Sequence, residues 1–278
     1  MRLTSSRAAA FGALFLFGAA VSGVAIGFVG LEWFLTPLDF TRPHSIDFYA
    51  SWHARLMVVT WSILLPAGIL AARFFKIVPG QDWPCVKDNP TWWKLHLWCQ
   101  WSGAVIALAA VALIFPHVWR TSSTAAIHRW LGWSVLILLG MQVAGGMLRG
   151  SKGGPTKPAD DGSWFGDHYN MTPRRVVFEY MHKSTGYATL LMSWAATCFG
   201  LWEVNAPRWM GLVLSIWWLA FIVTFLWLQH HGRARDTYEA IWGPDPIHPG
   251  NNVRPIGWGI VRATQRDDAE ECSSRHRL

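Results

Sequence analysis

The sequence predicts an all-α integral membrane protein, built as a bundle of six helices, and two observations predict this class. First, the chain of 278 residues is 52% hydrophobic and only 15% charged, with 20 tryptophans. That composition is too apolar for an ordinary soluble domain. Second, uncharged runs of membrane-spanning length recur along the chain and are separated by short charged segments.

The six candidate spans are uncharged runs of about 20 residues, the length that a helix rising 1.5 Å per residue needs to cross the hydrocarbon core. They are residues 8–30, 56–72 with a polar lead-in from residue 48, 95–119, 130–148, 184–202 and 209–229. The first run also resembles a signal peptide because Arg2 and Arg7 precede it. Its 23 uncharged residues favour a retained helix.

The positive charges lie mainly on one side of the predicted bundle. If the N-terminus is inside, residues 1–7, 73–94, 149–183 and the tail from residue 233 hold 19 of the 24 Lys and Arg residues. This positive-inside pattern predicts that both termini are cytoplasmic, and we expect a bacterial inner membrane. The net charge of +7 therefore reflects topology, so membrane lipid is an expected partner and nucleic acid is not.

The polar segments and the cysteines carry no soluble catalytic motif. Residues 150–180 are rich in Gly, Pro and Asp, and we expect this long loop and the tail after residue 231 to be irregular. The four cysteines, Cys85, Cys99, Cys198 and Cys272, show no C-x-x-C spacing. This excludes a zinc ribbon and covalent c-type haem attachment through that motif. Phosphate-loop, dinucleotide-binding and hydrolase motifs are also absent from the sequence.

Four of the eleven histidines share one feature, because each lies near the N-terminal end of a different predicted helix: His53, His96, His128 and His182. Successive helices run antiparallel, so His53 and His128 are expected near the outer face, and the other two near the inner face. Each pair suits bis-histidine ligation of a b-type haem between facing helices. We therefore predict two non-covalent b haems. Zinc is disfavoured because no Cys or carboxylate accompanies either pair.

Small residues follow each histidine on the same helical face. Gly132 and Gly186 lie one turn after His128 and His182, and we expect both glycines to leave room for a porphyrin. The face of His53 carries Thr60, Ala67 and Ala71, and the face of His96 carries Gln100, Gly103, Ala107 and Ala110. The face of His128 continues to Gly146, and that of His182 carries Thr189, Ser193, Ala196 and Gly200. Such faces are also common where membrane helices simply pack.

Arg55 is a further candidate cofactor-binding residue. It lies two residues after His53 and could pair with a haem propionate near the outer face. Snorkelling of its guanidinium to the membrane interface is the alternative.

These segments resemble the cytochrome b-561 superfamily. The stretch "WHARLMVVTWSILLPAGILAARFFK" at residues 52–76 is similar to its second helix, most closely in the ferric-reductase-like branch often joined to DOMON domains. "WWKLHLWCQ", "HRWLGW" and "HKSTGY" resemble the next three helices. The resemblance covers about residues 48–229, and we expect no DOMON domain in this chain. It implies six helices with a haem core of helices two to five, two b haems and electron transfer across the membrane.

The predicted function is that of a di-haem b-type cytochrome, a transmembrane oxidoreductase or electron carrier that moves single electrons between the membrane faces. Candidate donors are a quinol, an ascorbate-like compound or a cytoplasmic reductant; candidate acceptors are a ferric chelate or a periplasmic redox protein. Arg174, Arg175 and Lys183 are candidates for binding an anionic reductant. We expect no catalytic side chain. The membrane domain is predicted at residues 1–231, with its haem core at about 48–202, and a cytoplasmic tail at 232–278.

Two other functions stay open at this stage. The chain could be the haem-b membrane anchor of a dehydrogenase that exchanges electrons with quinone. It could also be a haem-free scaffold or transporter, although transporters usually show broken helices and repeats. Neither the direction of electron flow nor the oligomeric state, including a homodimer, follows from the sequence.

Overall fold

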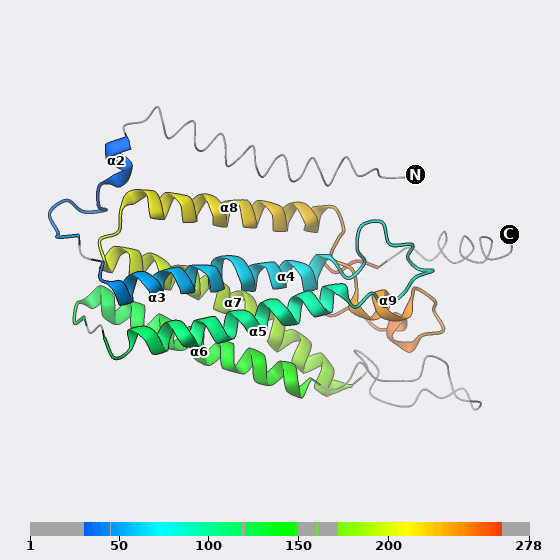
Figure 1. Cartoon of the computed structure of the whole chain (residues 1–278). Helices are drawn as coiled ribbons and strands as arrows, with labels where there is room; N and C mark the ends of the chain where they lie inside the picture. Colours follow the sequence, from blue (N-terminus) through cyan, green and yellow to red (C-terminus); the bar gives the residue numbers. More distant parts are fainter. Residues whose placement is uncertain (1–30, 45, 118–119, 150–159, 161–171, 263–278) are drawn as a thin grey trace.

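Five long helices run side by side and form the body of the protein (Figure 1). A computed structural model of the chain describes residues 31–44, 46–117, 120–149, 160 and 172–262. The long helices are the continuous segment α3 (Phe48–Val58), η1 (Val59–Leu64) and α4 (Leu65–Phe74), then α5 (Thr91–Ile114), α6 (Ser123–Leu148), α7 (Pro173–Glu203) and α8 (Arg208–His230). Across the described residues the regular structure is helical apart from two isolated β-bridges. The all-α class is therefore confirmed.

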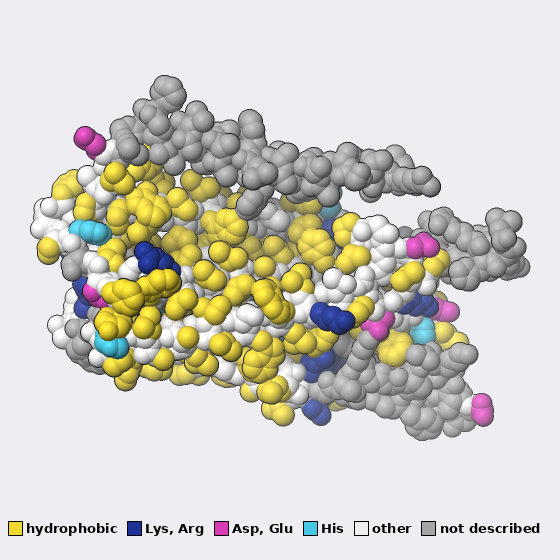
Figure 2. Space-filling model, viewed as in Figure 1, with side chains coloured by type: hydrophobic (Ala, Val, Ile, Leu, Met, Phe, Trp, Pro, Cys, Tyr) yellow, Lys and Arg dark blue, Asp and Glu magenta, His cyan; other side chains and the backbone are white. Residues whose placement is uncertain are grey.

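Four of these helices, Phe48–Phe74, α5, α6 and α8, are long and apolar enough to cross a membrane. Apolar side chains cover the visible flank of the bundle in Figure 2. The protein is therefore an integral membrane protein. The first predicted span, residues 8–30, lies outside the described residues.

Helix α7 holds the fifth predicted span, but it is not among the four most apolar helices. Its apolar half is interrupted by Thr189, Ser193 and Thr197, whose hydroxyls donate to carbonyls three or four residues earlier. Because these hydroxyls are satisfied within the helix, α7 can pack along α6, with which it makes its most extensive contact.

The start of α7 differs from the sequence-based expectation. Residues 173–180 were predicted to be part of an irregular loop, but α7 begins at Pro173, nine residues before His182. The Thr172 hydroxyl accepts from the Arg175 amide, and proline is well suited to the first helical position. Glu179 then forms ion pairs with Arg175 and Lys183, one turn away on each side, which support the polar part of the helix.

The second span contains a wide turn that the sequence did not predict. Residues Val59–Leu64 are π-helical, so this helix carries one residue more than a regular α-helix over the same turns. The predicted small face of Thr60, Ala67 and Ala71 is therefore wrong at Ala67, which is exposed. Gly68 is buried against α5 in its place.

The loops divide between two ends of the bundle. We name the end formed by residues 36–44, 46–47, 115–117, 120–122 and 204–207 the outer end, and the end formed by residues 75–90 and 231–262 the inner end. At the outer end the buried Asn205 amide donates to the carbonyls of Asp39 and Arg42. This side chain therefore ties the loop before α3 to the turn between α7 and α8.

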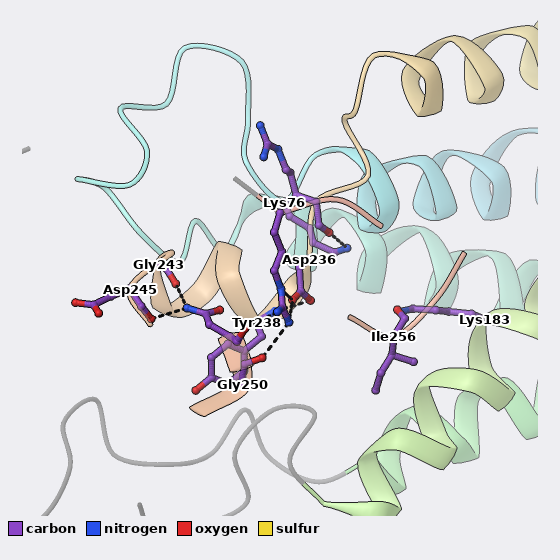
Figure 3. Close-up of polar contacts among 11 residues, drawn as sticks. Lys76, Lys183, Asp236, Tyr238, Gly243, Asp245, Gly250 and Ile256 are labelled. Atoms are coloured by element: carbon purple, nitrogen blue, oxygen red, sulfur yellow. Dashed lines mark hydrogen bonds and ion pairs between the residues drawn. The ribbon is translucent and has the colours of Figure 1, made fainter. Parts of the chain in front are cut away.

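The tail folds onto the inner end, and we name residues 232–262 the inner cap. It was expected to be irregular, but it contains α9 (Thr237–Trp242) and a 3₁₀ turn at Pro249–Asn252. Figure 3 shows how it is attached: the Lys76 ammonium donates to the Arg235 carbonyl at 2.8 Å, and Lys183 to the Ile256 carbonyl at 2.9 Å. Within the cap, Arg262 pairs with the buried Asp236 at 2.6 Å.

Candidate functional site: two histidine pairs

The four singled-out histidines come together in the two predicted pairs. In the outer pair, His53 of α3 and His128 of α6 have ring centroids 6.1 Å apart and ring planes at 79°. His53 Nδ1 donates to the Ala110 carbonyl of α5 at 3.0 Å. His128 Nδ1 donates to the Ala196 carbonyl of α7 at 2.8 Å. A carbonyl can only accept, so each Nδ1 carries a proton, and in the neutral imidazole Nε2 is then the nitrogen with the lone pair.

The inner pair repeats this arrangement with one difference. His96 of α5 and His182 of α7 have ring centroids 6.2 Å apart and ring planes at 76°. His96 Nδ1 donates to the Gly68 carbonyl of α4 at 3.0 Å. His182 Nδ1 is buried and has no hydrogen-bond partner among the described residues. Three of the four histidines are therefore oriented by a main-chain carbonyl on a neighbouring helix.

The spacing within each pair fits a single metal ion between two imidazoles. A metal bound at an imidazole nitrogen lies about 2 Å from that nitrogen, and hence about 3 Å from the ring centre. Two opposed ligands then place their ring centres about 6 Å apart, close to both observed separations. Metal-ligating histidines almost always donate their other ring N–H to a carbonyl or carboxylate, as three of these do.

The composition of each pair also bears on the kind of metal site. Among the described residues no group of three or more His, Cys, Asp and Glu side chains comes together. A tetrahedral zinc site needs four such ligands or three and a water. Two facing histidines in an apolar bundle are the donor set of a bis-histidine haem iron. The residues present therefore fit a b-type haem better than a bare metal ion.

The glycines on the helical faces of the histidines differ in the space around them. A Cβ atom built at Gly132 would meet nothing within 4 Å, which is consistent with open space beside His128. At Gly186 it would lie 3.9 Å from the Gln142 side chain. At Gly200 it would lie 3.1 Å from His128 Cε1, so α7 approaches this ring closely only because that position lacks a side chain.

The inner pair has an aromatic and cationic surround that sequence reasoning missed. Trp93 stacks on His96 with centroids 5.9 Å apart, and Phe178 stacks on His182 at 5.0 Å. The Arg149 guanidinium lies 3.9 Å from the Trp93 ring centre, and that of Arg175 lies 5.3 Å from the Phe178 ring centre. The signal was present in the sequence, because each aromatic residue precedes its histidine by three or four residues on the same helical face.

The predicted basic site for an anionic reductant is not an open cluster. Arg174 donates to the Leu148 carbonyl at the end of α6, with Nε at 3.0 Å. Arg175 is buried and pairs with Glu179 at 3.4 Å. Lys183 lies between Glu179, at 2.8 Å, and the inner cap. These cations are therefore engaged with the protein itself.

Lys76 adds a titratable group at the inner end. Burial, reinforced by the neighbouring Lys183 and Arg73 charges, lowers the pKa of its ammonium from 10.5 to about 7, although Glu179 and Asp236 oppose the shift. Its hydrogen bond to the cap therefore comes from an amine that changes charge near neutral pH.

Arg55 and the other described histidines lie apart from the two pairs. The Arg55 guanidinium lies 5.2 Å from the Trp52 ring centre and is exposed, which favours the interfacial alternative. His117 stacks on Tyr49 at 3.6 Å near the outer end. His44 bonds to the Asn205 carbonyl, and His248 is buried in the inner cap.

Fold and site together define a class: a helical membrane protein with a bis-histidine site near each end of a four-helix core. The comparisons with known proteins agree. Residues 52–151 match the family described as eukaryotic cytochrome b561, and this range includes His53, His96 and His128. Over these residues, which run from α3 to the end of α6, the chain is similar to the eukaryotic cytochrome b561 family.

Curated relatives extend the similarity beyond that range. A cytochrome b561, DM13 and DOMON domain-containing protein of Arabidopsis thaliana is 27% identical over 190 residues, covering 66% of this chain and 18% of the relative. Ferric-chelate reductase 1 of Homo sapiens is 28% identical over 182 residues, covering 65% of this chain and 26% of the relative. The chain thus spans about a quarter or less of these relatives. No solved structure matches it.

Proposed function

We propose that the chain holds two b haems, one between His53 and His128 and one between His96 and His182, and conducts single electrons between the two ends of the bundle. When bound, each haem supplies a one-electron carrier whose potential depends on its axial ligands and surroundings. The single observation that carries the proposal is the separation of the ring centroids, 6.1 and 6.2 Å.

The residues of the chain perform three tasks in this function. The carbonyls of Ala110, Ala196 and Gly68 fix three imidazoles with Nε2 directed away from the bonded helix. The buried apolar cluster between the pairs, which includes Trp61, Ala104, Ala107, Val135 and Leu139, excludes water from the middle of the bundle. The cap and the loops close the two ends.

The decisive test is a haem count with single-ligand variants. The purified protein should give a dithionite-reduced minus oxidised spectrum with a b-type α-band, and a pyridine haemochrome assay should give two haems per chain. His96→Ala or His182→Ala should remove one haem, and His53→Ala or His128→Ala the other. His117→Ala, which alters a histidine outside both pairs, is the control and should keep two. One haem per wild-type chain would disprove the two-site arrangement.

We further propose that both termini lie on the cytoplasmic side. The charge asymmetry supports this, since Arg73, Lys76, Arg149 and Lys183 all lie toward the inner end. The bacterial membrane remains an expectation from the sequence alone. Reporter fusions after residue 278 and in the loop at residue 120 test the orientation. If a reporter that is active only outside the cytoplasm were active at the C-terminal fusion, the proposed orientation would be wrong.

A ferric chelate is the proposed acceptor, supported by the similarity to ferric-chelate reductase 1. Proteoliposomes loaded with a reductant should reduce an external ferric chelate, and liposomes with His128→Ala should not. Unchanged reduction by that variant would exclude the proposed route. The proposed donor is a quinol, an ascorbate-like compound or another reductant, and the same proteoliposomes can compare these donors. The purified protein can be tested for a homodimeric state.

A further inference from the structure

The carbonyl acceptors of the histidine pairs follow a regular spacing. Ala110, which accepts from His53, lies fourteen residues after His96 on α5. Ala196, which accepts from His128, lies fourteen residues after His182 on α7. A regular helix turns about 100° per residue, so fourteen residues make almost four full turns. A histidine and the residue fourteen places later therefore share nearly the same helical face.

The second span breaks this spacing by one residue. The acceptor for His96 is Gly68, which lies fifteen residues after His53. On a regular helix the fourteenth residue, Ala67, would occupy that face, and Gly68 would be rotated by about 100°. The π-helical turn Val59–Leu64 lies between them and contains one additional residue. The additional residue of the π-helical turn compensates for the longer spacing, so Gly68 occupies the face that the fourteenth residue would occupy on a regular helix.

The position at which Gly68 meets α5 is closely packed, and a side chain there requires the end of the Gln100 side chain to shift. A Cβ atom at Gly68 would lie 2.5 Å from Gln100 Nε2 and 3.0 Å from Cys99 Cβ. Other contacts show the same register: Gln100 Nε2 donates to the Leu65 carbonyl at 3.3 Å. A Cβ at Gly103 would lie 2.7 Å from the Leu65 side chain. The residues that face α5 after the wide turn are thus Leu65 and Gly68.

The carbonyls within the wide turn are used by the neighbouring helices. Trp217 Nε1 of α8 donates to the Ser62 carbonyl at 2.6 Å, and Trp218 Nε1 to the Ser62 hydroxyl at 3.0 Å. Trp194 Nε1 of α7 donates to the Trp61 carbonyl at 3.4 Å. Trp194 and Trp218 stack face to face, 5.0 Å apart. In an apolar bundle these indole N–H groups need acceptors, which the wide turn supplies.

We propose that the π-helical turn is a one-residue insertion with a positioning role. It keeps Gly68 in register as the acceptor that orients His96, and it gives α7 and α8 main-chain and hydroxyl acceptors at Trp61 and Ser62. Ser62, Trp217 and Trp218 are thus positioning residues, which act on the inner pair through α4. The role of His96 as a ligand rests on the proposed function, whereas the register itself does not.

A crosslinking experiment tests the register without reference to haem. In a chain with Cys198→Ser, Gly68→Cys should form a disulfide with the native Cys99 under mild oxidation, because disulfide Cβ atoms lie about 3.8 Å apart. Ala67→Cys, one residue earlier and exposed, should crosslink at least tenfold less. Equal crosslinking, or more from Ala67→Cys, would overturn the register.

A pair of single-residue deletions tests the insertion. Removal of Ile63, an exposed residue of the wide turn, makes Gly68 the fourteenth residue after His53. The helix can then become regular with Gly68 still on α5, so the Gly68→Cys crosslink and the absorption and EPR signals of both haems should persist. Removal of Leu108, an exposed residue of the regular helix α5, is the matched control. It places Val111 at the fully buried position of Ala110 and should abolish the signal of the outer haem.

The outcomes separate this inference from the proposed function. A folded Ile63-deleted chain that loses the crosslink contradicts the insertion, whatever its haem content. If the deleted chain does not fold, the comparison of Gly68→Cys with Ala67→Cys in the full chain decides the register. If the crosslinks appear as expected but the protein binds fewer than two haems, the proposed function fails and the register stands. Trp218→Phe should shift the EPR signal of the inner haem and leave the outer one unchanged; no shift would exclude the indole contact from the positioning role.

Discussion

The outer and inner histidine pairs have almost the same ligand separation but different surroundings. In the outer pair both Nδ1 atoms donate to carbonyls, those of Ala110 and Ala196. In the inner pair only His96 does so, and His182 Nδ1 has no acceptor among the described residues.

Among the described residues, no aromatic side chain is found stacked on the outer rings, whereas each inner ring stacks on Trp93 or Phe178, whose own rings lie close to the guanidinium groups of Arg149 and Arg175. The two pairs thus have the same arrangement of histidines on facing helices, but they differ in the hydrogen-bond acceptors and the aromatic residues around their rings. Four experiments test this contrast between the two pairs.

The largest effect is expected at Gly200, where α7 approaches His128. Gly200→Val puts a branched side chain where even a Cβ would lie 3.1 Å from the ring. Overpacking of this kind costs about 1–3 kcal/mol, so retention of the outer haem should weaken roughly 5- to 150-fold. Haem content and EPR should show loss of the outer signal alone.

Gly140→Val is the matched control, since that exposed position has open space around it. Equal loss of both haems from Gly200→Val would mean that the substitution disturbs the bundle as a whole and not one pair.

The inner haem should have the higher midpoint potential. Nearby cations favour the reduced state, and a histidine without an acceptor for its N–H is a less basic ligand. Arg149→Gln should lower the inner potential by on the order of tens of millivolts and leave the outer one nearly unchanged. Spectroelectrochemical titration measures both. Arg55→Gln is the comparison at the outer end. A wild-type inner potential below the outer one would contradict the electrostatic contrast.

The inner cap should restrict access to the inner site only. Asp236→Asn removes the charge that pairs with Arg262, and a charge-assisted bond of this kind contributes about 1.5–3 kcal/mol. A loss of about 1 kcal/mol would open the cap roughly fivefold more often. Stopped-flow reduction by a membrane-impermeant reductant should then be faster at the inner haem.

Asp39→Asn, in an exposed outer loop, should leave that rate unchanged. Equal rates for Asp236→Asn and the wild type would show that the cap does not limit access.

The last experiment concerns the effect of pH on the inner cap. The pKa of Lys76 is about 7 in the folded protein against 10.5 for an ordinary lysine. Between these values the unfolded state binds more protons, so folded stability should rise with pH from 7 upward, by at most about 1.4 kcal/mol per unit. Hydrogen exchange of residues 232–262 between pH 7 and 9 measures this. Lys76→Met should flatten the slope; an unchanged slope would exclude Lys76 as its source.

Much of the site could be predicted from the sequence, because hydrophobic periodicity and antiparallel order depend only on local composition. Four histidines near helix starts, on helices that alternate in direction, were enough to predict the pairs His53–His128 and His96–His182, and the structure brings both together. The all-α membrane class was confirmed for the same reason. The start of α7 at Pro173 was missed, although Thr172 and Pro173 are a recognisable helix-start signal.

The sequence pattern is enough to assign residues to helices and to one or the other end of the bundle. The packing of the helices determines which carbonyl each imidazole meets, why Gly68 and not Ala67 faces α5, and how the tail covers the inner end. These features depend on contacts between helices far apart in the chain. A one-residue wide turn changes the hydrophobic pattern very little, but it rotates every later side chain by about 100°, and only the neighbouring helices show that it is there.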